Sequence, residues 1–218
     1  MSPSPLRFFF DYVSPYAYLA WTQLPALAER HGRALEAVPV LFAGVLNTLG
    51  TLGPAEVPAK RFYIYKHTHR LAHELGVPFV FPPAHPFNPL LALRVTAAVR
   101  EVEARRRLVS ALFSAAWAEG DGLVDPERVG ACVSAVGLDV QAVLAAAGTP
   151  DVKEQVRRNT EELLARGGFG VPTILADEEL FFGVDSLGHL DRFLRGEDSL
   201  PHEERERLRT LPMAASRL

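Results

Sequence analysis

Residues 7–21 read RFFFDYVSPYAYLAW, and this stretch decides the fold of the chain. Three consecutive phenylalanines followed by Asp11 predict a short buried strand that ends abruptly. Ser14 and Pro15 then begin an apolar helix, because serine is a preferred N-cap and proline fits the first helical position. The Ser14 hydroxyl is thereby expected among free backbone N–H groups at the positive end of the helix dipole, which suits an anion such as a thiolate. Taken alone, the same pattern is more often only a helix cap.

Composition bounds the class of protein. The chain has 218 residues, of which 48% are hydrophobic and 22% charged, as in an ordinary globular protein of one large domain or a small domain with an insertion. The net charge of −3 gives no reason to expect nucleic acid or an anionic membrane as a partner. No apolar run approaches the roughly 20 residues of a membrane helix, and the N-terminus lacks a signal-peptide core. A cytoplasmic location is therefore expected.

Cysteine and histidine usage argues against redox and metal chemistry. Cys132 is the single cysteine, so neither an intramolecular disulfide nor a dithiol redox cycle can form. It lies in an apolar stretch, where a lone cysteine is usually a small buried hydrophobe. His69 and His73 share a helix face near His67, but no HExxH pattern or carboxylate pair accompanies them, and we expect no metal site.

The order of predicted elements indicates the fold class. The first helix should run to His31 with a kink at Pro25, and the alternation in residues 34–40 predicts a second strand. A loop or broken helix is expected over 41–60, and helices over 61–75, 90–118, 126–136, 140–147 and 151–166. VPTILA and ELFFG then predict a hairpin, followed by a helix at 185–194 and a charged C-terminal segment with a possible helical turn at EERERLR.

This order, strand-helix-strand, then helices, then hairpin and helix, predicts an α/β fold. It is the order of a thioredoxin-like sheet with an inserted all-helical domain, the DsbA-like arrangement. Residues 1–40 and 169–218 would form the discontinuous thioredoxin-like domain, and residues 41–168 the helical insertion.

Several motifs along the chain carry a family resemblance. SPYAYLA after the first strand, LGPAEVPAKRFY, VPFVFP, FGVPTI and FFGVDSL occur in order from about residue 6 to 195. Together they resemble the kappa-class glutathione transferase and 2-hydroxychromene-2-carboxylate isomerase group, in the DsbA-like branch of the thioredoxin superfamily. Redox members of that branch begin the first helix with Cys-Pro-x-Cys, whereas this chain has Ser14-Pro15-Tyr16-Ala17. It therefore cannot exchange disulfides.

The resemblance implies glutathione as cofactor and assigns roles to five residues. Ser14 would donate a hydrogen bond to the glutathione thiolate. Val171-Pro172 matches a cis-proline that leaves the Val171 backbone free to pair with the cysteinyl backbone of glutathione. Asp185 matches the acidic residue that receives the γ-glutamyl ammonium, although a plain helix cap is the simpler reading of this residue. Lys60 matches a basic residue placed for a glutathione carboxylate.

Two positions depart from the family pattern. Val184 stands where a polar residue is usual, so only its backbone can help to hold the γ-glutamyl carboxylate. Thr51 stands where asparagine is expected in the loop. Both departures bear on affinity for the thiol and on its identity.

The second substrate is expected between the sheet and the helical insertion, since domain interfaces form pockets. Its candidate lining residues are Tyr12, Tyr16, Phe42, Phe87, Asn88 and Arg94. The aromatic members of this set are equally consistent with core packing. Either Lys60 or Arg94 could hold a substrate carboxylate.

The resemblance implies a glutathione-dependent cis–trans isomerase that interconverts 2-hydroxychromene-2-carboxylate and trans-o-hydroxybenzylidenepyruvate in aromatic catabolism. Its substrate would be a small aromatic carboxylate, and a homodimer is compatible with it. One alternative is a kappa-like glutathione transferase or peroxidase that uses the same thiolate site with a different electrophile. A second is a non-catalytic thioredoxin-fold protein that binds a peptide or acyl ligand in the cis-proline groove.

Overall fold

A four-stranded mixed sheet lies at the centre of the computed structural model, which describes residues 3–214. Its strands are β1 (Leu6–Phe10), β2 (Leu35–Pro39), β3 (Thr173–Ala176) and β4 (Glu179–Phe182), in the order β2-β1-β3-β4. β1 pairs in parallel with β2 and antiparallel with β3, and β3 forms the predicted hairpin with β4. The predicted α/β class with parallel first strands is therefore confirmed.

The crossover between β1 and β2 consists of two helices where the sequence predicted one kinked helix. α1 (Pro15–Trp21) is capped by Ser14, and α2 (Leu24–Arg30) begins after a break at Thr22 and Gln23. The break follows from Pro25, because proline is tolerated only in the first turn of a helix and therefore starts α2.

The middle of the chain is helical, as predicted. Its helices are α3 (Phe42–Leu49), α4 (Pro58–Leu75), α5 (Leu90–Ala98), α6 (Val102–Phe113), α7 (Pro126–Ala135), α8 (Val140–Ala147) and α9 (Pro150–Ala165), with 3₁₀ turn η1 (Pro54–Glu56) and π turn η2 (Ser114–Ala118). The prediction of a single helix over 90–118 is wrong, because Val99 and Glu101 have extended backbone conformations that separate α5 from α6. The Glu101 carboxylate accepts from the N–H groups of Glu103 and Ala104 and so starts α6 as a new helix.

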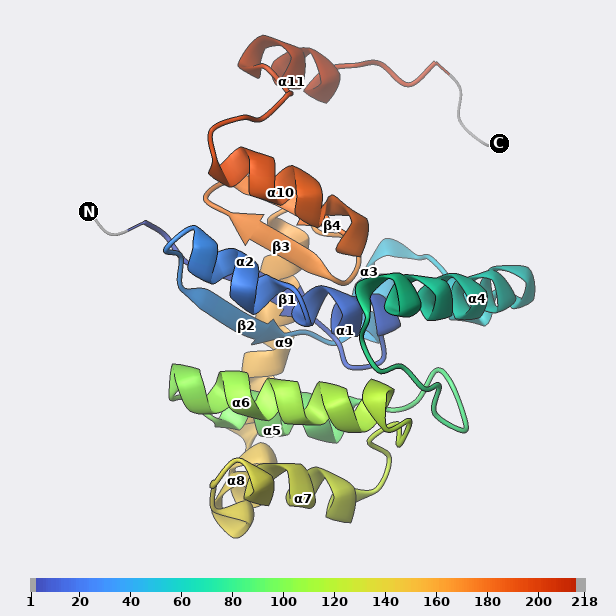
Figure 1. Cartoon of the computed structure of the whole chain (residues 1–218), viewed down its shortest axis with the longest axis vertical. Helices are drawn as coiled ribbons and strands as arrows, with labels where there is room; N and C mark the ends of the chain where they lie inside the picture. The colour runs from blue at the N-terminus through green and yellow to red at the C-terminus, as the bar shows by residue number, and fades with distance from the viewer. Residues whose placement is uncertain (1–2, 215–218) are drawn as a thin grey trace.

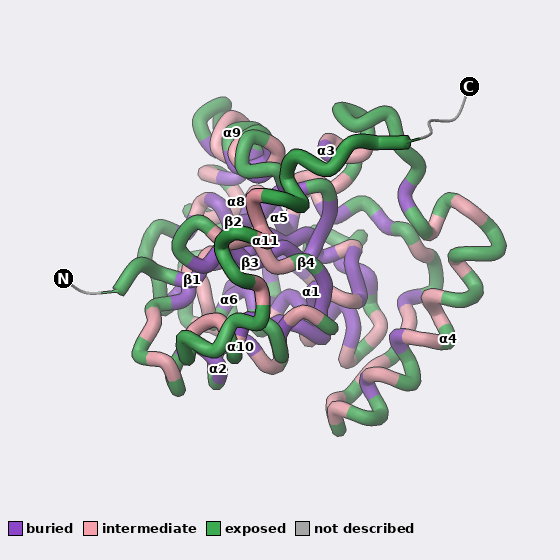
Figure 2. Tube along the Cα trace, turned by 90° about the horizontal axis from the view of Figure 1, so that it is seen from above, coloured by how far each residue is buried: buried purple, intermediate pink, exposed green. Residues whose placement is uncertain are grey.

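The C-terminal part follows the hairpin with a 3₁₀ turn, η3 (Val184–Ser186), α10 (Leu187–Leu194) and the exposed α11 (His202–Arg209). Figure 2 shows α11 without a buried residue, whereas β1, β3 and α1 are mostly buried. Among residues 3–214, no helix is both long and apolar enough to cross a membrane.

The alternating side chains of β1 fill two cores, one on each face of the sheet. Leu6, Phe8 and Phe10 pack with α1, α2 and the helices α5–α7, where the ring of Phe10 lies 5.3 Å from that of Phe113. Phe9 packs on the opposite face with side chains of α3 and α9. Figure 1 shows α1 and α2 in front of the sheet and α9 running behind it. Helices of the middle segment thus pack on both faces of the sheet, and the division into two domains stays a prediction.

Cys132 lies in that core, on α7. Its thiol is buried beside the Ala111 carbonyl, and burial raises the pKa of the Cys132 thiol. The predicted structural role of this cysteine is consistent with its position, because a protonated buried thiol is a poor nucleophile.

Candidate functional site

The turn from β1 into α1 presents the Ser14 hydroxyl at the start of the helix. The N–H of Ala17 donates to Ser14 Oγ over 3.2 Å, and the hydroxyl points to the carbonyl of Val171 at 3.4 Å. An O–H···O hydrogen bond is normally 2.5–3.0 Å long, so the second contact is weak. Ser14 is therefore held in place as an acceptor while its proton remains free to turn to another acceptor.

The segment before β3 faces this hydroxyl, although it is 157 residues away in the chain. The Val171–Pro172 peptide bond is cis, as predicted from the FGVPTI motif. Within the described part of the chain, the Val171 N–H has no acceptor, and its carbonyl meets only the weak contact with Ser14. This backbone edge is thus open to pairing with a peptide-like ligand.

Two donors from distant elements bind the backbone carbonyls just before α1. Trp117 Nε1–H donates to the carbonyl of Tyr12 over 2.8 Å, and His85 Nε2–H donates to the carbonyl of Val13 over 2.8 Å. The Tyr12 carbonyl is the one that a helical hydrogen bond from Tyr16 would use. In the described structure the Tyr16 N–H has no acceptor, so it adds a second free donor beside Ser14.

The Tyr16 side chain lies in the same first turn. Its hydroxyl is hydrogen-bonded to His67 Nδ1 on α4 at 2.8 Å, and the His67 ring stacks on Tyr63. Burial, followed by the nearby charges of Tyr63 and Asp185, raises the pKa of Tyr16 to about 12. The phenol is therefore protonated at neutral pH and can act as a hydrogen-bond donor.

The carboxyl group of Asp11 is buried next to the turn from β1 into α1. Asp11 is almost fully inaccessible, and its two oxygens accept from the N–H groups of Val13 (3.0 Å) and Phe42 (2.9 Å). Burial raises the pKa of Asp11 to about 7, although both backbone donors oppose the shift. Asp11 thereby ties the end of β1 to the start of α3, and Phe42 joins the apolar cluster that contains Val171.

Asp185 and Lys60 differ in how closely the structure connects them to Ser14. Asp185 is exposed on η3, which packs against α1. Its negative charge contributes to the raised pKa of Tyr16. Val184 is buried beside it, so a ligand can meet only the Val184 backbone there. Lys60 is exposed in the first turn of α4 and has no ion-pair partner among residues 3–214. Ser14, Val171-Pro172 and Asp185 thus surround the start of α1, with Lys60 on a helix that packs against α1.

The predicted substrate-pocket residues are not gathered around one opening. Tyr12 is 0% exposed, and its hydroxyl is 2.7 Å from Thr96 Oγ1, so the prediction that it lines an open pocket is corrected to a core position. Phe87 is also buried, against Trp117. Tyr12 and Phe87 are therefore core residues, as in the alternative interpretation of the aromatic side chains.

The other predicted pocket residues have mixed positions. Asn88 is exposed and accepts from the Leu90 N–H at the start of α5. Phe42 is half-buried, and Arg94 is largely covered, with its Nε buried and without a partner in the described structure. None of them lines either of the two hollows described next.

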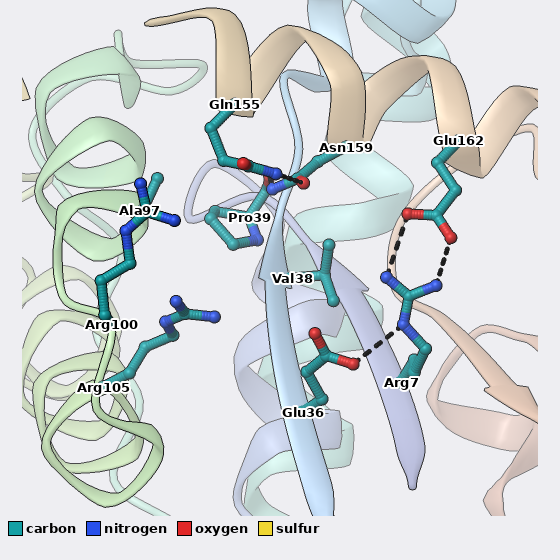
Figure 3. A pocket seen from close by; sticks show the side chains of 10 residues that line it. All are labelled: Arg7, Glu36, Val38, Pro39, Ala97, Arg100, Arg105, Gln155, Asn159 and Glu162. Atoms are coloured by element: carbon teal, nitrogen blue, oxygen red, sulfur yellow. Dashed lines mark hydrogen bonds and ion pairs between the residues drawn. The ribbon is translucent and has the colours of Figure 1, made fainter. Parts of the chain in front are cut away.

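Two hollows occur elsewhere on the molecule. One, of about 230 Å³, lies between the strands β1 and β2 and the helices α5, α6 and α9 (Figure 3). The other, of about 380 Å³, is an open depression along α4 lined by Tyr65, Lys66, His69, Arg70 and Phe81. The first lies between sheet and helices, but none of the predicted pocket residues lines it, and Ser14 borders neither hollow.

Sequence reasoning missed three side chains that shape the site: Asp11 as a buried acid, His85 and Trp117. Burial lowers the pKa of His85, which favours the neutral ring that donates to Val13. Nothing local in HPFNP or AAWAEG indicates these contacts, because each joins residues more than 70 positions apart. In the described residues no three His, Cys, Asp or Glu side chains gather as metal ligands.

Comparison with known proteins places the chain in a family. Residues 5–195 match the DSBA-like thioredoxin domain, and the chain belongs to this family. Within it, the chain is similar to a particular group. It is 29% identical over 191 residues to the 2-hydroxychromene-2-carboxylate isomerase of Sphingobium xenophagum, which covers 87% of this chain and 97% of that protein. It is also 26% identical to glutathione S-transferase kappa 1 of Homo sapiens, over 88% of this chain and 91% of the transferase.

A solved structure supports the same grouping. A 2-hydroxychromene-2-carboxylate isomerase superposes with a TM-score of 0.81 at 26% identity, covering 88% of this chain and 94% of that one. The resemblance inferred from the motifs is therefore confirmed, as is the DsbA-like fold.

Proposed function

We propose that this chain is a glutathione-dependent cis–trans isomerase of the 2-hydroxychromene-2-carboxylate type, acting in the cytoplasm in the breakdown of aromatic compounds. The names of its relatives support an isomerase. The observation that carries the proposal is the Ser14 hydroxyl, fixed by Ala17 N–H, with only one weak acceptor and next to the open backbone edge of Val171.

The residues present fit glutathione. Ser14 Oγ–H and Tyr16 N–H are two donors for a sulfur anion at the positive end of α1. Val171 can pair its N–H and carbonyl with the cysteinyl backbone, as in strand addition. The exposed Asp185 carboxylate suits an ammonium, and Lys60, which has no ion-pair partner in the described part of the chain, suits a carboxylate.

When bound, glutathione would supply a thiolate that adds reversibly to the conjugated carbon of the substrate, so that the double bond becomes a rotatable single bond and is restored when the thiolate leaves. Ser14 makes this possible by favouring the thiolate over the thiol. A hydrogen bond to a charged group contributes roughly 1.5–3 kcal/mol, and one pKa unit corresponds to about 1.4 kcal/mol. One such bond therefore lowers a thiol pKa by about one to two units. Tyr16, protonated at neutral pH, can donate to a substrate oxygen, and Lys60 or Arg94 can pair with the substrate carboxylate.

The test is Ser14→Ala, assayed for glutathione-dependent isomerisation of 2-hydroxychromene-2-carboxylate. Turnover should fall by at least about tenfold, within the range that proton and charge stabilisation commonly contributes. The fold should survive, since loss of a serine cap costs about 1 kcal/mol. Thr149→Ala is the matched control, because Thr149 caps α9 through the Val152 N–H, a contact made on another helix. Equal turnover in both variants would refute the role of Ser14.

A kappa-like transferase or peroxidase is the second candidate, favoured by the similarity to the human kappa enzyme. It would use the same Ser14 corner, so the electrophile decides between them. An assay with an aryl halide beside the chromene carboxylate separates the two activities. Calorimetry with glutathione tests both enzymes against the third alternative, a non-catalytic protein that binds a peptide or acyl ligand. Absence of glutathione binding at millimolar concentration would exclude both glutathione-dependent enzymes.

A further inference from the structure

The 230 Å³ cavity in Figure 3 has a charge pattern that the proposed function does not use. Strand residues Arg7 and Glu36 lie on one side and Glu162 of α9 joins them. Arg100, in the link between α5 and α6, and Arg105 of α6 lie across from them. None of these side chains belongs to the surroundings of Ser14, so any ligand here is independent of the thiol site.

Both carboxylates of this cavity are paired with Arg7. Arg7 Nε donates to Glu36 Oε2 over 3.0 Å, and the two terminal nitrogens of Arg7 donate to both oxygens of Glu162. This bidentate geometry is the favoured pairing of arginine with a carboxylate. One guanidinium therefore serves two carboxylates, and neither is paired with Arg100 or Arg105.

Arg105 is positioned but not neutralised. Its Nε donates to the carbonyl of Val99 over 2.7 Å, while Nη1 reaches the carbonyl of Ala37 only at 3.5 Å. Neither Arg105 nor Arg100 has a carboxylate partner among the described residues. Burial lowers the pKa of Arg105, the charge of Glu36 opposes this, and the like charge of Arg100 adds to it. The two guanidinium groups thus repel each other, and several of their N–H donors have no acceptor among the described residues.

The amide side chains do not supply acceptors for these donors. Asn159 Nδ2 donates to the Pro39 carbonyl, and Asn159 Oδ1 accepts from Gln155 Nε2. The amides therefore satisfy one another and the end of β2. Among the described residues no carboxylate lies within ion-pair distance of Arg100 or Arg105, although the charge of Glu36 acts on Arg105.

We propose that this cavity binds a small, multiply charged oxyanion, such as a phosphate group or a short dicarboxylate, through Arg100 and Arg105. Guanidinium groups bind such oxyanions in bidentate fashion. The volume lies below the roughly 300–1,000 Å³ of pockets for drug-sized ligands, which suits a small anion rather than an aromatic substrate. The bound anion joins the α5–α6 link to the edge of β2.

Inorganic phosphate and succinate are the probes, titrated calorimetrically into the full chain at constant ionic strength maintained with sodium chloride. We expect saturable binding of at least one of them, and a rise in melting temperature with the same anion. The anion that binds more tightly distinguishes a phosphate from a dicarboxylate ligand.

Arg100→Gln is the decisive variant, because Arg100 is exposed and makes no hydrogen bond in the described structure, so the fold should not depend on it. Its affinity for the anion should fall by about tenfold or more, the range of one charge-assisted hydrogen bond. Arg107→Gln removes the same charge from an exposed position of α6 outside the cavity and should change affinity by no more than about twofold. Absence of saturable binding of both anions, or equal affinities of the two variants, would overturn the proposal.

Discussion

Replacing Asp11 with asparagine should change how the stability of the protein depends on pH. Burial raises the pKa of Asp11 from 3.8 to about 7, against the opposing effect of the Phe42 and Val13 N–H donors. Between these values the folded protein keeps the proton while the unfolded chain has released it. The folded state then binds more protons, so the free energy of unfolding decreases as the pH rises through this window.

The size of the effect follows from that difference. Each pKa unit corresponds to about 1.4 kcal/mol, and the gap is about three units. Ionisation of Asp11 should therefore lower the free energy of unfolding by about 4 kcal/mol between about pH 4 and pH 8. Asparagine has one carboxamide oxygen for two N–H donors, and one unsatisfied buried donor costs about 1–3 kcal/mol at any pH. The variant should thus be less stable than the original at about pH 4 and equally or more stable at about pH 8.

Urea unfolding monitored by circular dichroism, from about pH 4 to about pH 8, measures this crossing. Asp125→Asn is the control for removing one aspartate, because Asp125 is exposed and caps α7 through the Glu127 N–H. If the stability difference between Asp11→Asn and the original protein stays constant over this range, Asp11 is not the buried acid described above.

Two further predictions concern packing around the site. Trp117→Phe should lower the free energy of unfolding by about 2–4 kcal/mol, because the buried indole fills the core and its N–H satisfies the Tyr12 carbonyl; a loss below about 0.5 kcal/mol in urea unfolding would contradict this. Gly168→Ala should cost about 1–3 kcal/mol, since a Cβ there would lie 2.9 Å from the Leu163 carbonyl oxygen. Gly188→Ala, with open space at its Cβ on α10, should instead be neutral or stabilising by up to about 1 kcal/mol, and equal losses in both glycine variants would refute the steric argument.

Local signals were sufficient for the strand-to-helix corner. Proline and serine have strong positional preferences, so Ser14-Pro15 predicted both the helix start and the placement of the hydroxyl. The order of strands and helices likewise followed from periodicity and turn residues. The cis form of Val171–Pro172 came from the family resemblance of its motif, since most X–Pro bonds are trans.

Long-range contacts explain what the sequence did not reveal. Tyrosine is a residue type common in pockets, but the position of Tyr12 in the core depends on Thr96 and Phe113, which are far away in the chain. The interruption before α6 depends on Glu101 acting as a cap, and acidic residues are also common inside helices. The arginine-lined cavity joins two strands and three helices, which no local pattern can specify.

The most direct test of the central claim is the pKa of the glutathione thiol when bound, followed by the ultraviolet absorbance of the thiolate in the original protein and in Ser14→Ala. If the Ser14 hydroxyl stabilises the sulfur anion, the bound thiol in the original protein should have a pKa at least about one unit below the value of about 8.5 for a free thiol. In Ser14→Ala the pKa of the bound thiol should return most of the way to that value. A bound thiol that titrates at the same pH in both proteins would contradict the account.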